Sequence, residues 1–193
     1  MERRAVMAER LVDGRVIKAC QHGDREAFRL LFETYKDRVF SIAVYSLGDQ
    51  AIADDVTQQI FLKLFTAIGQ FRGDSEFTTW LYRLVVNACL DERRRARRLV
   101  SWGDSVAMKN PSEKRSQEKQ YARKEIAEAV QNAISQLKPK FRLPILLKYV
   151  EGLSYDEIAA VMGCSKGTVA SRLNRGHGEL AKRLAHLRNE ASW

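Results

Sequence analysis

Side chains that could bind nucleic acid gather in one short stretch near the C-terminus, between residues 154 and 184. Their basic, amide and hydroxyl groups can contact phosphate oxygens or the edges of bases in a major groove. The residues expected to face DNA in this stretch include Lys166, Ser171, Arg172, Asn174 and Arg175. The chemistry predicted here is binding of a polyanion, with a few side chains reading its sequence.

Residues that could ligate a metal or act as nucleophiles are scattered instead. Cys20, Cys89 and Cys164 are odd in number and far apart, without the close pairs of a zinc site or a disulfide framework. The three histidines are equally dispersed, and no carboxylates cluster. We therefore expect no metal, no cofactor, no small-molecule substrate and no catalytic residue, so the protein is not expected to be an enzyme.

The basic residues are placed by two short helices that the sequence predicts around a tight turn. Ser154 and Glu157 have the spacing of a capping box, which starts the first helix. Gly163 suits the left-handed position at its end, and Ser165 can cap the second helix. This is helix-turn-helix spacing. Two amphipathic helices with a solvated basic face would be the plainer interpretation, but the ordered combination of features favours DNA binding.

Composition agrees with a polyanionic partner. The 193 residues include 33 Lys and Arg against 24 Asp and Glu, a formal charge of +9, and 45% are hydrophobic. No apolar run approaches the roughly twenty residues that span a bilayer. The N-terminus is charged throughout and lacks the apolar segment of a secretion signal. We expect a cytoplasmic protein without membrane insertion.

Apolar residues recur at helical spacing along most of the chain, and no convincing β-alternation is present. Periodicity is lost only between residues 99 and 119, where Ser, Asn, Gly, Lys and Glu collect. The predicted fold is all-α, with two small helical domains joined by a flexible linker. The predicted boundaries are 16–98 for the first domain, 99–119 for the linker and 120–190 for the second, which contains the helix-turn-helix.

The first domain carries two further candidate surfaces. A helix over about 51–68 places a polar row away from its apolar stripe, with Phe61 and Phe65 close to that row and partly exposed. This row is either a solvated face or a surface covered by another protein. A polar loop over 70–76 precedes a helix that carries Asn87 and ends in an arginine run. That run is either a solvated helix end or a support for a strand whose unstacked base enters a pocket.

Three segments, in this order, resemble the extracytoplasmic-function sigma factors of bacterial RNA polymerase. They are ADDVTQQIFLKLF, FRGDSEFTTWLYRLVVNACLD and YVEGLSYDEIAAVMGCSKGTVASRLNRGHGEL. The resemblance implies a dissociable initiation subunit that directs core RNA polymerase to promoter DNA and assists melting. It also implies an anti-sigma factor as a partner in the cell.

The resemblance assigns a role to three groups of residues. The residues that would bind core polymerase are Asp55, Gln58, Gln59, Phe61 and Phe65. Those that would capture the minus-ten element are Phe71, Arg72, Asp74, Ser75, Glu76 and Asn87. Those that would read the minus-thirty-five element, counting Lys166 from the helix-turn-helix, are Lys148, Tyr155, Asp156, Lys166, Ser171, Arg172, Asn174 and Arg175.

A stand-alone helix-turn-helix transcriptional regulator, which binds duplex operators as a dimer, is the alternative. It accounts for the second domain without the first. It leaves the face around Phe61 and Phe65 unexplained.

Overall fold

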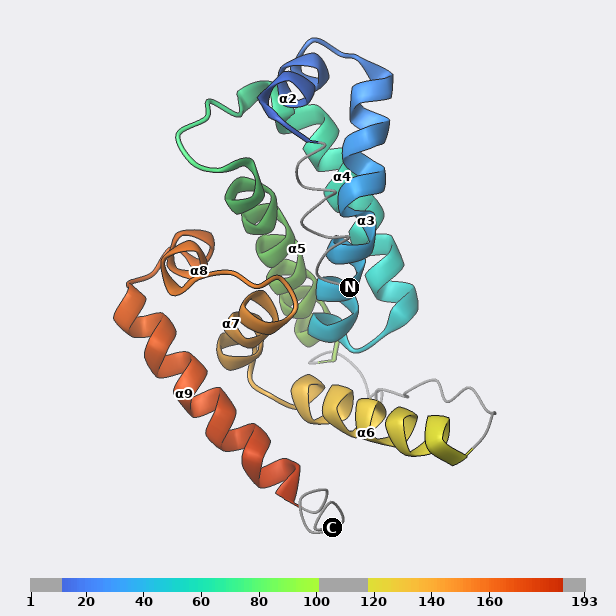
Figure 1. Cartoon of the computed structure of the whole chain (residues 1–193), viewed down its shortest axis with the longest axis vertical. Helices are drawn as coiled ribbons and strands as arrows, with labels where there is room; N and C mark the ends of the chain where they lie inside the picture. Colours follow the sequence, from blue (N-terminus) through green and yellow to red (C-terminus); the bar gives the residue numbers. More distant parts are fainter. Residues whose placement is uncertain (1–11, 101–117, 186–193) are drawn as a thin grey trace.

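The computed structural model describes residues 12–100 and 118–185. In these ranges the chain forms eight α-helices and one short 3-10 helix, without a strand (Figure 1). The predicted all-α fold is confirmed. Among the helices of these ranges, none combines the length and apolar character that crossing a membrane requires.

The first group of helices forms the N-terminal half of the described chain. They are α2 (Gly14–Gln21), α3 (Arg25–Leu47), α4 (Gln50–Ala67), the 3-10 helix η1 (Ile68–Gln70) and α5 (Phe77–Val100). Helices α3 and α4 form an antiparallel pair, and α5 packs against both (Figure 1). Their shared core consists of side chains that are almost wholly buried. It includes Leu31, Tyr35, Val39, Ile42, Ile60, Leu64, Leu81 and Val85.

Local capping chemistry explains where these helices begin. Asp13, Asp24 and Asp49 each accept hydrogen bonds from the first backbone N–H groups of the helix that follows. Gly48 ends α3 in the left-handed conformation, with φ of 78°, which a glycine adopts without steric cost. The chain therefore breaks between α2 and α3 at residues 22–24, and between α3 and α4 at residues 48–49.

The second group consists of α6 (Glu118–Ser135), α7 (Pro139–Tyr149), α8 (Tyr155–Met162) and α9 (Lys166–Arg183). The capping box of Ser154 and Glu157 is formed, Gly163 is left-handed with φ of 60°, and the Ser165 hydroxyl caps α9. The helix-turn-helix that the sequence predicts is thus present in α8 and α9.

The two groups pack against each other along α3 and α5, which the sequence did not predict. Helix α8 lies beside α5 (Figure 1), and α6 and α7 pack against α3. The Tyr82 hydroxyl donates to the Glu151 carboxylate, and Arg83 Nε donates to the carbonyl oxygen of Ala160 at 2.8 Å. Helix α5 continues to Val100 and α6 begins at Glu118, so most of the predicted linker, residues 101–117, lies outside the described residues.

A buried arginine of α7 also crosses this seam. Arg142 is only 1% exposed and donates to the carbonyl oxygens of Ser46 and Leu137. Arg93 Nη1 donates to the same Ser46 carbonyl at 2.8 Å. The end of α3 therefore accepts hydrogen bonds from both halves of the molecule.

Candidate nucleic-acid and polymerase interfaces

Helix α9 presents one exposed polar face. Ser171, Asn174 and Arg175 are exposed, and their spacing of three and four residues puts them on the same side of the helix. Lys166 starts the helix and pairs with Asp156 at 2.8 Å, with both side chains largely exposed. The pair connects the first turn of α8 to the first turn of α9. Of the set predicted from the sequence, Asp156, Lys166, Ser171, Asn174 and Arg175 are thus exposed on α8 and α9.

Lys148 and Tyr155 support the turn in front of α8. Lys148 Nζ donates to the Leu153 carbonyl oxygen at 3.1 Å and lies 5.7 Å from the centre of the Tyr155 ring. Both residues are half-buried. In this structure their contacts stabilise the start of the helix-turn-helix, and their side chains are not part of its exposed face.

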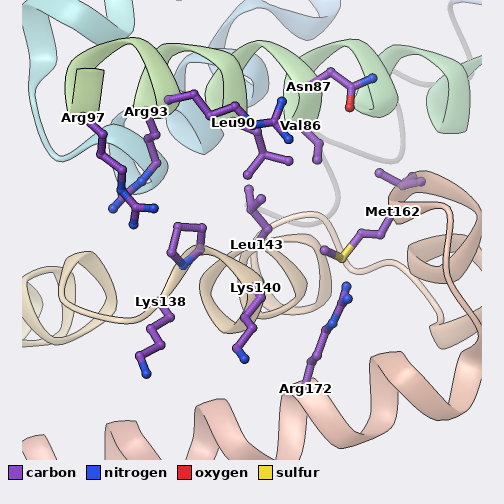
Figure 2. A pocket seen from close by; sticks show the side chains of 13 residues that line it. Val86, Asn87, Leu90, Arg93, Arg97, Lys138, Lys140, Leu143, Met162 and Arg172 are labelled. Atoms are coloured by element: carbon purple, nitrogen blue, oxygen red, sulfur yellow. The ribbon is translucent and has the colours of Figure 1, made fainter. Parts of the chain in front are cut away.

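Arg172 lies on a different side of α9 from Ser171 and Arg175. It projects toward α5 and lines a pocket between the two groups of helices, of about 590 Å³ (Figure 2). Its guanidinium approaches Cys164 Sγ at 3.7 Å. Asn87 of α5 lines the same pocket from the opposite wall.

The pocket is strongly positive. None of its described lining residues is acidic, and six are basic. These are Arg93, Arg94, Arg97, Lys138, Lys140 and Arg172. The positive charges repel one another: burial and the charge of Arg97, four residues further along α5, lower the pKa of Arg93. Burial and the charge of Arg93 lower the pKa of Arg142, behind the pocket, to about 9, so it stays charged at neutral pH.

The loop before α5 is anchored by aromatic side chains. The Phe71 ring packs edge-on against Phe77, with 5.6 Å between the ring centres, and against Trp80 at 5.5 Å. The residues that follow turn outward, with Gly73 at φ of 80°. Arg72, Asp74 and Glu76 are exposed and Ser75 is half-buried.

Asn87 is exposed but does not lie next to this loop. It is ten residues beyond Phe77 on α5, a distance of about 15 Å at the helical rise. It shares a face of α5 with Trp80 and Arg83, because these positions are three, four and seven residues apart. A strand that reached both the loop and Asn87 would have to run along this face of the helix.

The outer face of α4 combines a polar row with exposed apolar side chains. Asp55, Gln58 and Gln59 are exposed as predicted, and Phe65 is 50% exposed while its ring packs edge-on against Phe28 at 5.0 Å. The expectation that the Phe61 ring is partly exposed is wrong. It is 5% exposed and packs against Phe32, with ring centres 4.7 Å apart.

Leu62 takes the place on this face that the sequence analysis gave to Phe61. Its side chain is 68% exposed, more than any other described large apolar residue. The spacing of Asp55, Gln58 and Leu62 by three and four residues is the signal that would have identified it. Phe61, one position earlier, is turned about 100° away and into the core.

Comparison with known proteins agrees with both halves of this arrangement. The family described as sigma-70 region 2 matches residues 31–99, and the family described as sigma-70 region 4 matches residues 124–180. The RNA polymerase sigma-H factor of Pseudomonas aeruginosa is 36% identical in an alignment of 187 positions that covers 93% of this chain and 97% of that protein. The ECF RNA polymerase sigma-E factor of Escherichia coli is 34% identical in an alignment of 195 positions that covers 94% of this chain and 98% of that protein.

Two solved structures share the fold. The structure of CnrH in complex with the cytosolic domain of CnrY has a TM-score of 0.69 and 24% identity, covering 91% of this chain and 98% of that one. The sigma factor RpoE in complex with the anti-sigma factor NepR, from Bartonella quintana, has a TM-score of 0.66 and 23% identity, covering 82% and 96%. The chain belongs to the sigma-70 family and, within it, to the ECF sigma factors of RNA polymerase. It therefore acts in transcription initiation, as a transcription regulator that binds core polymerase and promoter DNA.

Proposed function

We propose that this sigma factor divides its work among three surfaces. The outer face of α4, formed by Asp55, Gln58, Gln59, Leu62 and Phe65, holds core polymerase. The loop from Phe71 to Glu76 and the Asn87 face of α5 capture the melted minus-ten strand. The exposed face of α9, with Lys166, Ser171, Asn174 and Arg175, reads the minus-thirty-five element in the major groove. No residue acts as a catalyst, and the protein works in the cytoplasm.

The observation that carries this proposal is the pair of exposed apolar side chains on α4. Leu62 and Phe65 lie beside a polar row, which is the composition of a protein-binding surface with an apolar centre and a polar rim. A stand-alone regulator that binds DNA through α9 has no use for this face. A polymerase subunit requires one.

The domain boundaries proposed from the sequence, 16–98 and 120–190, fit this division of work. Each side of the division has its own capped helices, and the two sides are joined by apolar packing of α3 and α5 on α6, α7 and α8, together with polar bonds such as Tyr82 to Glu151 and Arg83 to Ala160. Arg172 becomes available to DNA only when the pocket opens. The relatives whose structures were solved with CnrY and NepR suggest that an anti-sigma factor also binds this chain.

Run-off transcription with core polymerase, combined with two variants, tests the proposal. Leu62→Ala with Phe65→Ala should weaken core binding by at least about 2 kcal/mol, because buried apolar anchors dominate such interfaces. Its affinity for minus-thirty-five duplex should stay at the wild-type value. Each affinity can be measured by fluorescence anisotropy.

Arg175→Ala is the reciprocal control. It should weaken duplex binding by about 1–3 kcal/mol if the guanidinium makes a base contact, and leave core binding intact. A chain that binds duplex as a two-fold dimer and gives no transcript with core polymerase would support the stand-alone regulator instead.

A further inference from the structure

The side chain of Gln21, the last residue of α2, reaches the loop before α5. Gln21 Nε2 donates to the carbonyl oxygen of Ile68 at 3.1 Å and to that of Phe71 at 2.8 Å. A primary amide has two N–H donors, so one side chain makes both bonds at once. The two carbonyls lie at the two ends of η1, and the second belongs to the first residue of the loop.

Phe71 is consequently held from two sides. Its backbone carbonyl is bound by Gln21, and its ring packs on Phe77 and Trp80. Phe77 is itself the first residue of α5 and is buried, so the far end of the loop is fixed as well. The exposed residues between these two anchors start from a defined position and direction.

We propose that Gln21 is a positioning residue for capture of the melted promoter strand. It touches no DNA; it fixes the loop at Phe71, so that the residues up to Glu76 are ordered before the strand arrives. Ordering a loop costs conformational entropy, and a loop ordered in advance does not incur that cost during binding. The inference rests on the proposed minus-ten role of this loop, and it extends that role to α2, outside the matched residues 31–99.

Three substitutions separate hydrogen bonding from shape. Gln21→Met keeps the length of the side chain but has no donor, and Gln21→Glu keeps the shape but turns a carboxylate toward two carbonyl oxygens. Gln21→Lys restores donors through its ammonium group. Full-length protein with core polymerase is followed by permanganate reactivity of the promoter, and hydrogen exchange reports on the amides of residues 71–76.

The expected order of promoter opening is wild type, then Lys, then Met, then Glu. Gln21→Met should open the promoter about 3–10-fold more slowly, which corresponds to losing about one ordinary hydrogen bond. Amide exchange in the loop should rise in the same order. Affinities for core polymerase and for minus-thirty-five duplex should not change. Lys18→Met, on the exposed side of the same helix, is the matched control and should open promoters at the wild-type rate.

Two results would overturn the inference while leaving the capture role of the loop intact. One is wild-type opening by Gln21→Met in an assay where Arg72→Ala with Asp74→Ala, in the exposed loop, opens slowly; the loop then captures DNA without help from Gln21. The other is a parallel loss of core affinity and melting temperature in Gln21→Met, with no recovery in Gln21→Lys, which marks a purely structural side chain. If the loop variant itself opens at the wild-type rate, the proposed capture role fails, and the role of Gln21 fails with it.

Discussion

At the scale of single residues, the three cysteines differ sharply in their surroundings. Cys20 and Cys89 are buried, whereas Cys164 is half-exposed next to α9. Burial raises the pKa of Cys89 to about 11, and burial together with the nearby Asp24 carboxylate raises the pKa of Cys20. Only the thiolate is strongly nucleophilic, so these two thiols are chemically quiet in the folded protein.

Thiol labelling should therefore be selective. With iodoacetamide at pH 8, Cys164 should react first, while Cys89, with roughly one thiolate in a thousand at that pH, should react only after unfolding. Peptide mass spectrometry against time gives the three rates. In denaturant the rates should converge, since all three thiols then have ordinary pKa values. Fast native labelling of Cys89 would show that α5 opens locally.

Single positions also mark where sequence reasoning lost accuracy. It identified the outer side of α4 correctly but assigned Phe61 to it and omitted Leu62, which is 68% exposed. Adjacent residues on a helix differ in direction by about 100°, so an error of one position moves a side chain between solvent and core. Tyr82, next to the exposed Arg83 on α5, shows the same effect, since it is buried and bonds to Glu151 of the second half.

At the scale of helices, α9 approaches α7 closely because one residue lacks a side chain. A Cβ atom at Gly176 would lie 2.6 Å from Cδ1 of Ile145 and 3.5 Å from Cβ of Phe141. A Cβ atom at Gly178, two residues further along α9, would have no neighbour within 4 Å. These two glycines of one helix are thus a matched pair, one required by packing and one not.

Gly176→Val should destabilise the protein by about 1–3 kcal/mol, because the added methyl groups force α7 and α9 apart. Gly178→Ala should stabilise it by up to about 1 kcal/mol, since alanine has a lower entropic cost in a helix. Urea unfolding followed by circular dichroism measures both. Equal stabilities for the two variants would show that the α7–α9 contact is looser than the geometry indicates.

Helix boundaries were the part of the fold best predicted from sequence. Caps such as Asp24, Asp49 and Ser154 act within three residues of themselves, so their signals are local and legible. The contact of Arg142 with Ser46 joins positions 96 residues apart and has no such local signal. The same holds for Gln21 and Phe71, which are 50 residues apart.

At the scale of the whole molecule, a continuous apolar core and a small number of polar bonds join the two halves. The Tyr82 hydroxyl is buried, and its donation to Glu151 is one of the direct bonds across the seam. Burial and the Glu151 charge raise the pKa of Tyr82 well above its usual range, so the phenol keeps its proton and remains a donor. The basic residues that line the pocket repel one another, and this repulsion opposes the bond between Tyr82 and Glu151.

Tyr82→Phe should shift the molecule toward separated halves by about 1.5 kcal/mol, the value of a hydrogen bond to a charged group. Energy transfer between a dye on Cys164 and a dye on an introduced Asp54→Cys should fall accordingly. Tyr45→Phe, also in the first half, is the control and should leave the transfer unchanged. If Tyr82→Phe gives wild-type transfer, other contacts hold the seam closed.

Asn87 and Arg172 line one pocket, and their closeness limits how far apart on DNA these two side chains can bind. The two promoter elements are separated by some 25 base pairs, or about 85 Å of duplex. Under the proposed division of work, side chains that face each other across one cavity cannot touch both elements at once, so the two halves would have to separate for Asn87 and Arg172 to reach them. A binding partner that spans the seam would hold the two halves together. A partner that binds only one half would favour their separation.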